Sequence, residues 1–160
     1  MTDSSILQPL TVIAVAGCGL MAGLFFVFSV SVMKALAQMP PHEGMKAMQF
    51  INRTILNSVF LATFFGTAIS CLSIAVISAI QRQAGYGWSL SGATVYLLGG
   101  FFVTARINVP LNNALDDLSA SAEDSPQQWD RYLKRWTRWN HFRTVASITA
   151  VVLLTTSLLQ

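Results

Sequence analysis

Long apolar runs separated by short polar segments make up most of the chain, and this pattern predicts helices that cross a membrane. A spanning helix needs about 20 predominantly apolar residues, and in lipid it satisfies its own backbone hydrogen bonds. Four runs have about this length or more, at residues 6–32, 54–80, 88–107 and 141–159. The pattern therefore predicts an all-α integral membrane protein, a four-helix bundle in which residues 1–160 form a single four-span domain.

The polar segments between the runs predict helical extensions at one end of the bundle. Residues 45–53 are expected to lead helically into the second run. Before the last run, Ser125, Pro126 and Gln128 have the pattern of a helix start, with a capping serine, a proline at the first helical position and a glutamine three residues after the cap. Because nothing interrupts the sequence after this start, an amphipathic helix over residues 126–140 is expected to be continuous with the last span.

Small residues at intervals of four predict two close-packing faces. Gly19 and Gly23 form such a pair in the first run, and the second run has the same spacing in Ala62, Gly66 and Ser70. Small side chains at this spacing let a neighbouring helix approach closely. These faces suit packing within the bundle, and they suit assembly of a homo-oligomer as well.

Another side of the second run combines polar and apolar residues and is expected to face the interior. At about 100° per residue, this side carries Asn52, Leu56, Val59, Thr63 and Gly66. Its polar members would lose their hydrogen bonds against lipid, which is costly. We therefore predict that this side is turned inward.

Composition and charge fit a membrane protein and suggest its orientation. Hydrophobic residues make up 53% of the chain and charged residues only 11%, against about 45–50% and 25% in soluble domains. Nine of the ten lysines and arginines fall in the first and third connections, counting Arg106 and Arg143 with the latter. Cytoplasmic loops carry such an excess, so we expect both termini on the non-cytoplasmic side of a bacterial inner membrane, with the helical extensions in the cytoplasm. The lipid bilayer is then the expected partner, and nucleic acid is not.

The two cysteines, Cys18 and Cys71, both lie inside apolar runs. A metal site would need more ligands close together, and a disulfide outside the cytoplasm would be expected near the ends of the spans. We therefore expect both to be small core residues. No metal site is predicted, and the metal content is left open.

A polar stretch, Arg106 to Asn113, begins where the third apolar run stops. Asn108 and Asn112 are four residues apart and share one face of a helix. Pro110 lies between them and would remove a backbone donor and press on the carbonyl of Arg106. Buried amides need partners, so this stretch is either an ordinary helix stop or the polar part of a site.

A second polar stretch opens the last apolar run. Helical spacing places Trp136, Asn140, Arg143 and Ser147 on one face and His141 on another. An arginine within a span costs about 2.5–3.5 kcal/mol at mid-membrane on insertion scales, and is a functional candidate by default. Near a helix end it can instead extend to the headgroups. If the polar face is inward, His141 points to lipid or headgroups, and it is either an interfacial histidine or a catalytic base.

The two stretches together resemble the anthrone oxygenase family of small four-span membrane proteins. The resemblance rests on Asn-x-Pro-Leu-Asn at residues 108–112 and on Trp-x-x-Trp-Asn-x-x-Arg-Thr at residues 136–144, and it covers nearly the whole chain. It implies oxidation of a small phenolic, anthrone-like molecule by dioxygen. No organic cofactor is implied beyond dioxygen as co-substrate.

The resemblance also implies roles for particular side chains. Amides would orient the substrate, a cation would hold its oxyanion, and a base would remove a proton. The catalytic candidates are Asn108, Asn112, Asn140, Arg143 and His141. His141 is included because it is the nearby side chain with a suitable unperturbed pKa, although its helical phase points away. The substrate-binding candidates are Trp136, Trp139 and Asn52, and interface anchoring explains the two tryptophans equally well.

Two non-enzymatic alternatives compete with the oxygenase. One is a membrane accessory protein or a lipid- or small-molecule-binding protein, because small-residue faces also suit assembly with a partner. The other is a small transporter, which the chain supports less because it has no internal repeat and no paired broken helices. Convergence of Asn108, Asn112, Asn140 and Arg143 on one enclosed pocket would favour a site over a set of unrelated polar residues.

Overall fold

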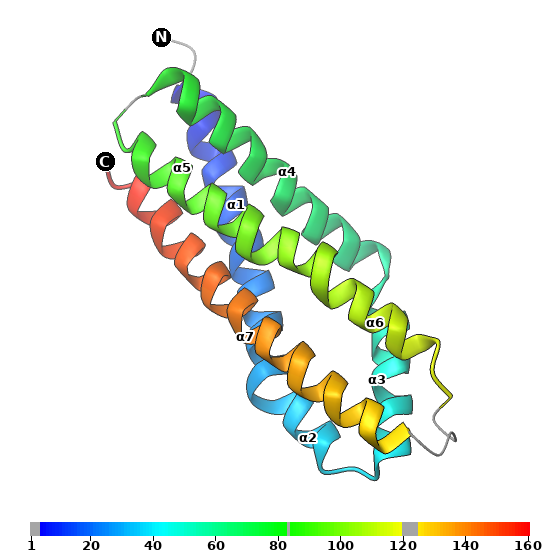
Figure 1. Ribbon diagram of the computed structural model, residues 1–160. Coiled ribbons are helices and arrows are strands. Elements are labelled where there is room, and N and C mark those ends of the chain that lie inside the picture. Colours follow the sequence, from blue (N-terminus) through cyan, green and yellow to red (C-terminus); the bar gives the residue numbers. More distant parts are fainter. Residues whose placement is uncertain (1–3, 83, 120–124) are drawn as a thin grey trace.

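The computed structural model describes residues 4–82, 84–119 and 125–160, and this part of the chain contains helices and no strands (Figure 1). The first half of the chain forms α1 (Ser4–Val27), η1 (Phe28–Val32), α2 (Met33–Ala37), α3 (Pro41–Ile55) and α4 (Ser58–Gln81). The π-helical turn η1 joins α1 and α2 without a break.

The second half of the chain contains two long, continuous helices. The first consists of α5 (Tyr86–Val95), η2 (Tyr96–Phe102), η3 (Thr104–Asn108) and α6 (Val109–Asp116), and η2 and η3 are again π-helical. The other long helix is α7 (Ser125–Ser157). The helix at the end of the chain therefore begins where the capping pattern predicts, and the amphipathic part is continuous with the last apolar run.

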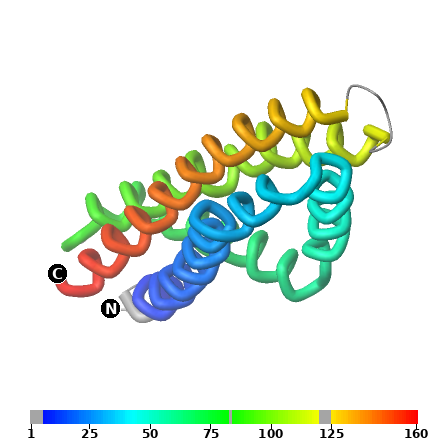
Figure 2. The backbone as a smooth tube through the Cα atoms, turned by 90° about the horizontal axis from the view of Figure 1, so that it is seen from below, coloured from blue at the N-terminus to red at the C-terminus, as the bar shows by residue number. Residues whose placement is uncertain are grey.

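Four helices form the bundle. Helix α1 packs against α4 and α7, and α5 packs against the same two helices, which closes a ring of four. Both termini lie at one end of the bundle, and α2, α3, α6 and the start of α7 lie at the other (Figure 1). Figure 2 shows α3 crossing that far end at a steep angle to the long helices. The all-α four-helix bundle with helical extensions is confirmed.

Three of the long helices are apolar enough to cross a membrane, at Ile6–Ala37, Ser58–Gln81 and Tyr86–Asp116. The protein is therefore a membrane protein. Helix α7 is not among these three, because Asn140, His141 and Arg143 lower its mean hydropathy. It packs between α1 and α5 as the fourth member of the bundle. That it also crosses the bilayer, and on which side the termini lie, stay predictions.

The second apolar run differs from the prediction because the chain breaks between α3 and α4. Leu56 leaves helical geometry and Asn57 is extended, and the Asn57 Oδ1 accepts a hydrogen bond from the Phe60 N–H at 3.0 Å. This is an N-cap, so a new helix begins at Ser58. Leu56, Val59 and Gly66 are exposed, and the predicted inward side is therefore wrong for them.

Within the bundle, most members of the predicted close-packing faces do not pack against a neighbouring helix. Gly19, Gly23 and Gly66 have open space where a Cβ would lie, and they sit on the outside of the bundle. Close packing occurs instead at Gly17, where a Cβ would overlap the Thr67 side chain. The apolar runs carry small residues on several faces, and only packing decides which face meets a neighbour. A homo-oligomer stays a prediction.

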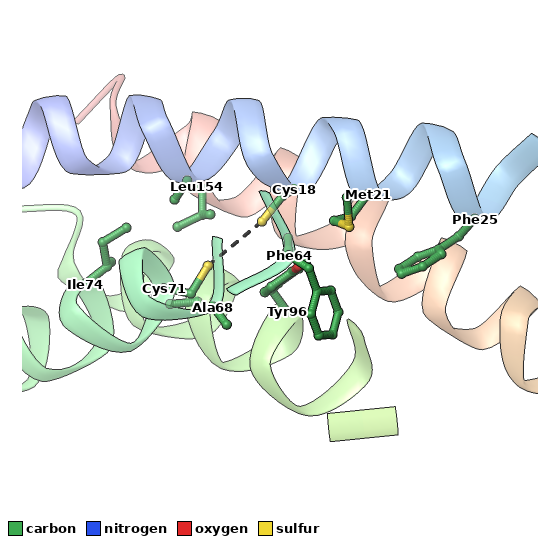
Figure 3. Packing of buried hydrophobic residues seen from close by; sticks show 12 residues of the cluster. Cys18, Met21, Phe25, Phe64, Ala68, Cys71, Ile74, Tyr96 and Leu154 are labelled. Atoms are coloured by element: carbon green, nitrogen blue, oxygen red, sulfur yellow. Dashed lines mark hydrogen bonds between the residues drawn. The ribbon is translucent and has the colours of Figure 1, made fainter. Parts of the chain in front are cut away.

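The centre of the bundle is an apolar cluster that includes both cysteines (Figure 3). Cys18 and Cys71 are fully buried and free, with their Sγ atoms 3.9 Å apart. Tyr96 and Leu154 pack into the same cluster. The prediction that both cysteines are small core residues is confirmed.

The stretch around Pro110 is not a helix stop. The helix passes through it and continues to Asp116. Just before the proline, η3 makes a wider turn in which the Val109 N–H donates to the Thr104 carbonyl, five residues back. Such π-turns inside helices occur mostly as single turns and often at functional sites. The turn places Asn108 at its end, facing the bundle interior.

Candidate functional site

A pocket lies at the end of the bundle away from the termini, between α1, α4, η3–α6 and α7, and beside the end of α3. Its volume is about 260 Å³, close to the lower end of the roughly 300–1,000 Å³ typical of small-molecule sites. The lining is mainly apolar and rich in aromatic rings, including Phe25, Phe28, Phe60 and Phe64. A pocket of this size and character suits a flat, mostly apolar ligand.

Six of the eight candidate residues line this pocket. They are Asn52, Asn108, Asn112, Trp136, Asn140 and Arg143. They come from α3, η3, α6 and α7, so residues almost 100 positions apart in the sequence meet here. Asn108, Asn112, Asn140 and Arg143 therefore converge on one pocket, which favours a site over a set of unrelated polar residues.

The other two candidates, His141 and Trp139, do not line the pocket. His141 is exposed on the outer side of α7, as its helical phase predicts, because it follows the inward-facing Asn140 by one residue. Trp139 is half-buried and packs edge-on against Phe142 at 6.0 Å between ring centroids. The structure therefore corrects the candidate set: His141 cannot take a proton directly from a molecule in this pocket.

Arg143 is buried and turned inward, which excludes the alternative that it extends to the headgroups. Its Nη2 donates to the Asn140 Oδ1 at 2.6 Å and its Nη1 to the Thr104 Oγ1 at 3.0 Å. The guanidinium also lies 4.2 Å from the ring centroid of Phe25 and 5.2 Å from that of Trp136. Neutral dipoles and aromatic faces therefore surround the charge.

No carboxylate pairs with Arg143 in the part of the chain that the structure describes. Burying a charge without an opposite charge is costly, and dipoles and ring faces compensate only in part. The pocket therefore carries a net positive charge in apolar surroundings. Such a site favours an anionic group on its ligand.

Asn140 fixes the position of Arg143. Its Nδ2 donates to the Phe25 carbonyl and to the Ser29 Oγ, both at 2.7 Å, while its Oδ1 accepts from Arg143. These bonds tie α7 to α1 at the point where α1 widens into η1. The Asn140 side chain thus holds the Arg143 guanidinium in place through hydrogen bonds that its amide already makes within the protein.

Asn112 fixes two aromatic side chains of α7. Its Oδ1 accepts hydrogen bonds from the Tyr132 hydroxyl at 2.9 Å and from the Trp136 Nε1 at 2.8 Å. Trp136 is therefore a buried wall of the pocket and not an interface anchor. Burial raises the pKa of Tyr132 above its ordinary value, and the charge of Arg143 opposes part of this shift.

Three buried polar atoms on pocket-lining residues have no hydrogen-bond partner among the described residues. They are the Asn52 Nδ2, the Asn108 Oδ1 and the Arg143 Nε. An unsatisfied buried polar group costs about 1–3 kcal/mol, so each such atom needs an explanation. A ligand that supplies two acceptors and one donor would satisfy all three.

Sequence reasoning missed the two charged residues at the mouth of the pocket. Arg53 donates from Nη2 and Nε to the Asp116 Oδ1, at 2.7 and 2.8 Å, and both residues line the pocket. Asp116 is the only carboxylate among the lining residues that the structure describes. Each charge alone looks like an ordinary loop residue, and only the crossing of α3 over α6 brings them together.

Metal ligands do not cluster in the described residues: no group of three or more His, Cys, Asp or Glu could hold an ion there. Independence from metals and cofactors stays a prediction.

A family model described as anthrone oxygenase matches residues 56–153 of the chain. The matched region contains Asn108, Asn112, Trp136, Asn140 and Arg143, and it leaves out Asn52 and Arg53. No curated protein and no solved structure matches the chain.

Proposed function

The chain belongs to the anthrone oxygenase family, and from this premise we propose that it oxidises a small phenolic aromatic molecule of the anthrone type with dioxygen. The observation that carries this proposal is the buried cation of Arg143, which faces an aromatic pocket without a carboxylate partner among the described residues. A protonated arginine in such a place favours a substrate that becomes an anion during the reaction.

The hydrogen-bonding groups of a hydroxyanthrone suit the unpartnered atoms of the pocket. Loss of a proton from the methylene carbon of the central ring places negative charge on the carbonyl oxygen opposite. In the proposal this oxygen accepts from the Arg143 Nε, a phenolic oxygen accepts from the Asn52 Nδ2, and a phenolic O–H donates to the Asn108 Oδ1. Phe25 and Trp136 lie close to the guanidinium and would pack against the rings.

The proposed reaction needs no external reductant. The methylene carbon loses a proton and becomes an electron-rich carbanion, which transfers electrons to dioxygen and forms a carbon–oxygen bond. Protonation gives a hydroperoxide. Loss of the second proton from the same carbon breaks the oxygen–oxygen bond and releases a quinone and one water molecule. The substrate supplies all four electrons, and one dioxygen is consumed for each quinone.

The protein's part is to make the first proton loss easier and to keep water out. Arg143 stabilises the enolate oxygen in apolar surroundings, where a charge interaction is stronger than in water. Asp116 is the lining carboxylate, and in the proposal it accepts the methylene proton and returns it to solvent at the pocket mouth. Asn140 and Asn112 position Arg143 and Trp136 and do not themselves contact the reacting atoms.

Oxygen uptake by purified, metal-analysed protein with 1,8-dihydroxyanthrone tests the proposal. We expect uptake above the uncatalysed rate, and at least a tenfold loss in Arg143→Ala, equivalent to about 1.4 kcal/mol of transition-state stabilisation. Arg138→Ala is the matched control, because Arg138 is exposed on the same helix and does not line the pocket. Uptake at the uncatalysed rate, or equal loss in both variants, would reject the oxygenase.

A ligand-binding protein without catalysis is the second candidate. The observation in its favour is that Asp116, the one lining carboxylate described, is already held by Arg53. This candidate predicts that the pocket binds 1,8-dihydroxyanthraquinone tightly while the protein consumes no oxygen with the anthrone. The two measurements together separate the candidates.

A further inference from the structure

The pocket opens on one side of the bundle. Its exposed lining residues are Arg53, Leu56, Phe65, Val109, Asn113 and Asp116, and all of them belong to the end of α3, the junction after it, α4 or α6. The lining residues on α1, η1 and α7 are buried or half-buried. The opening is therefore the seam between the start of α4 and η3–α6.

Three of these six exposed residues are apolar and form one border of the opening. Leu56, Phe65 and Val109 are 60%, 49% and 38% exposed. Phe65 lies within the candidate span Ser58–Gln81 and Val109 within Tyr86–Asp116. A seam between two spanning helices meets lipid, so Phe65 places this border of the opening toward the bilayer, with Leu56 and Val109 beside it.

Aromatic rings continue from this entrance into the pocket. The exposed ring of Phe65 contacts Phe64 edge-on with centroids 5.5 Å apart, and Phe64 stacks on Phe60 at 5.7 Å. Phe60 and Phe64 line the pocket. A flat aromatic molecule would therefore meet ring surfaces from the outside of the bundle to the polar groups within.

Polar contacts tie α3 to α6 at the other side of the opening. Arg53 pairs with Asp116, and the Gln49 Nε2 donates to the carbonyls of Leu115 at 2.8 Å and Leu118 at 3.1 Å. These bonds hold α3 across the end of α6. The side of the mouth nearest the helical extensions is thereby bridged by charged and polar groups.

We propose that the substrate enters from the lipid bilayer, through the seam between α4 and α6, while the Arg53–Asp116 pair closes the aqueous side. The proposal rests on the proposed function only in taking an apolar aromatic molecule as the ligand. The apolar border formed by Leu56, Phe65 and Val109 then selects for neutral, flat molecules dissolved in the membrane. The ligand acquires its negative charge only after it has reached Arg143.

A removable block at the seam tests the route. Leu56→Cys protein in lipid vesicles is modified with benzyl methanethiosulfonate, which does not reach the buried Cys18 and Cys71. The probe is 1,8-dihydroxyanthraquinone dissolved in the vesicles, and the readout is the rate at which it quenches Trp136. The fluorescence that is lost in the Trp136→Phe variant identifies the contribution of Trp136 to the signal. We expect modification to slow quenching at least tenfold and a reducing agent to restore it.

Two controls make the test specific. Ile69→Cys, modified in the same way, places the same group on an exposed position of α4 that does not line the pocket, and its quenching rate should be unchanged. Anthraquinone-2-sulfonate, which stays in water, should not quench Trp136. Unchanged quenching after modification at Leu56→Cys, equal slowing at Ile69→Cys, or rapid quenching by the sulfonate would each overturn the route.

The route and the oxygenase can fail separately. Quenching that the block at Leu56→Cys slows, in a protein that consumes no oxygen with the anthrone, supports the route and rejects the oxygenase. Oxygen uptake that the block leaves unchanged supports the oxygenase and rejects the route.

Discussion

The Arg143 Nη2 donates a 2.6 Å hydrogen bond to the Oδ1 of Asn140, one turn earlier on the same face of α7. Asn140 is in turn bonded to the backbone of α1 through the Phe25 carbonyl. The guanidinium is therefore fixed between two helices of the bundle, and its Nε is left without a partner among the described residues. A cation fixed in this way need not reorganise when charge develops on a ligand, which is the condition for efficient electrostatic catalysis.

Replacing Arg143 by lysine tests whether activity needs only the positive charge or also the planar shape of the guanidinium. Lysine keeps a positive charge, but it lacks the planar fork that reaches Asn140 and Thr104 at the same time. We expect Arg143→Lys to lower kcat/KM for the anthrone at least tenfold, with Arg138→Lys unchanged. Steady-state oxygen uptake provides the measurement, and activity close to wild type in Arg143→Lys would show that charge alone is sufficient.

Tyr132→Phe should lower the free energy of unfolding because Tyr132 is bonded to Asn112 beside the pocket. It removes the donor to the Asn112 Oδ1 and keeps nearly the same volume, so the expected cost is about 1 kcal/mol of unfolding free energy. Thermal unfolding in detergent or lipid measures the change. A stability equal to wild type would mean that this hydrogen bond contributes nothing measurable.

The same variant should change the response to alkaline pH. The pKa of Tyr132 is raised in the folded protein because burial disfavours the tyrosinate. This contribution to stability is complete below the unfolded pKa of about 10, and it is lost as the pH rises from there through the folded pKa. The stability difference between wild type and Tyr132→Phe should therefore shrink above about pH 10, and a constant difference up to higher pH would contradict this.

A pair of neighbouring glycines tests the packing of α1. A Cβ at Gly17 would overlap the Thr67 side chain, whereas a Cβ at Gly19 meets open space. Gly17→Ala should lower stability by about 1–3 kcal/mol, the usual cost of overpacking, and Gly19→Ala should not lower it. Equal stability of the two variants would place the α1–α4 contact elsewhere on the helix.

Asn57→Ala should destabilise the start of α4 because it removes the cap on the Phe60 N–H. The expected cost is about 1 kcal/mol, and Asn57→Ser, which keeps a capping oxygen, should remain close to wild type. Since α4 forms part of the pocket wall, Asn57→Ala should also raise the KM for the anthrone more than Asn57→Ser does. No difference between the two variants in either measurement would contradict this role of the cap.

Helical periodicity predicted the inward side of α7 correctly. Trp136, Asn140, Arg143 and Ser147 are all buried, and His141 is exposed. The prediction succeeded because one uninterrupted helix carries all five residues, so a single period relates them. The same regularity explains why the length and the start of this helix could be predicted.

Other features depend on contacts between segments that are distant in the sequence. The break at Leu56 and Asn57 was missed because an apolar run hides a single capping asparagine. The Arg53–Asp116 pair forms only because α3 crosses α6, and no local pattern relates the two residues. Most of the small residues in the predicted faces do not pack within the bundle, because spacing alone does not say which side meets a neighbouring helix.

The binding of 1,8-dihydroxyanthrone without oxygen tests most directly whether Arg143 stabilises an anionic form of the substrate. The enolate absorbs at longer wavelength than the neutral anthrone, so an anaerobic absorption titration at pH 7 distinguishes the two forms in the pocket. We predict that wild-type protein and Arg138→Ala bind the enolate, and that Arg143→Ala binds only the neutral form or does not bind. A neutral spectrum with the wild type, or an equal enolate signal with Arg143→Ala, would contradict the proposed role of this residue.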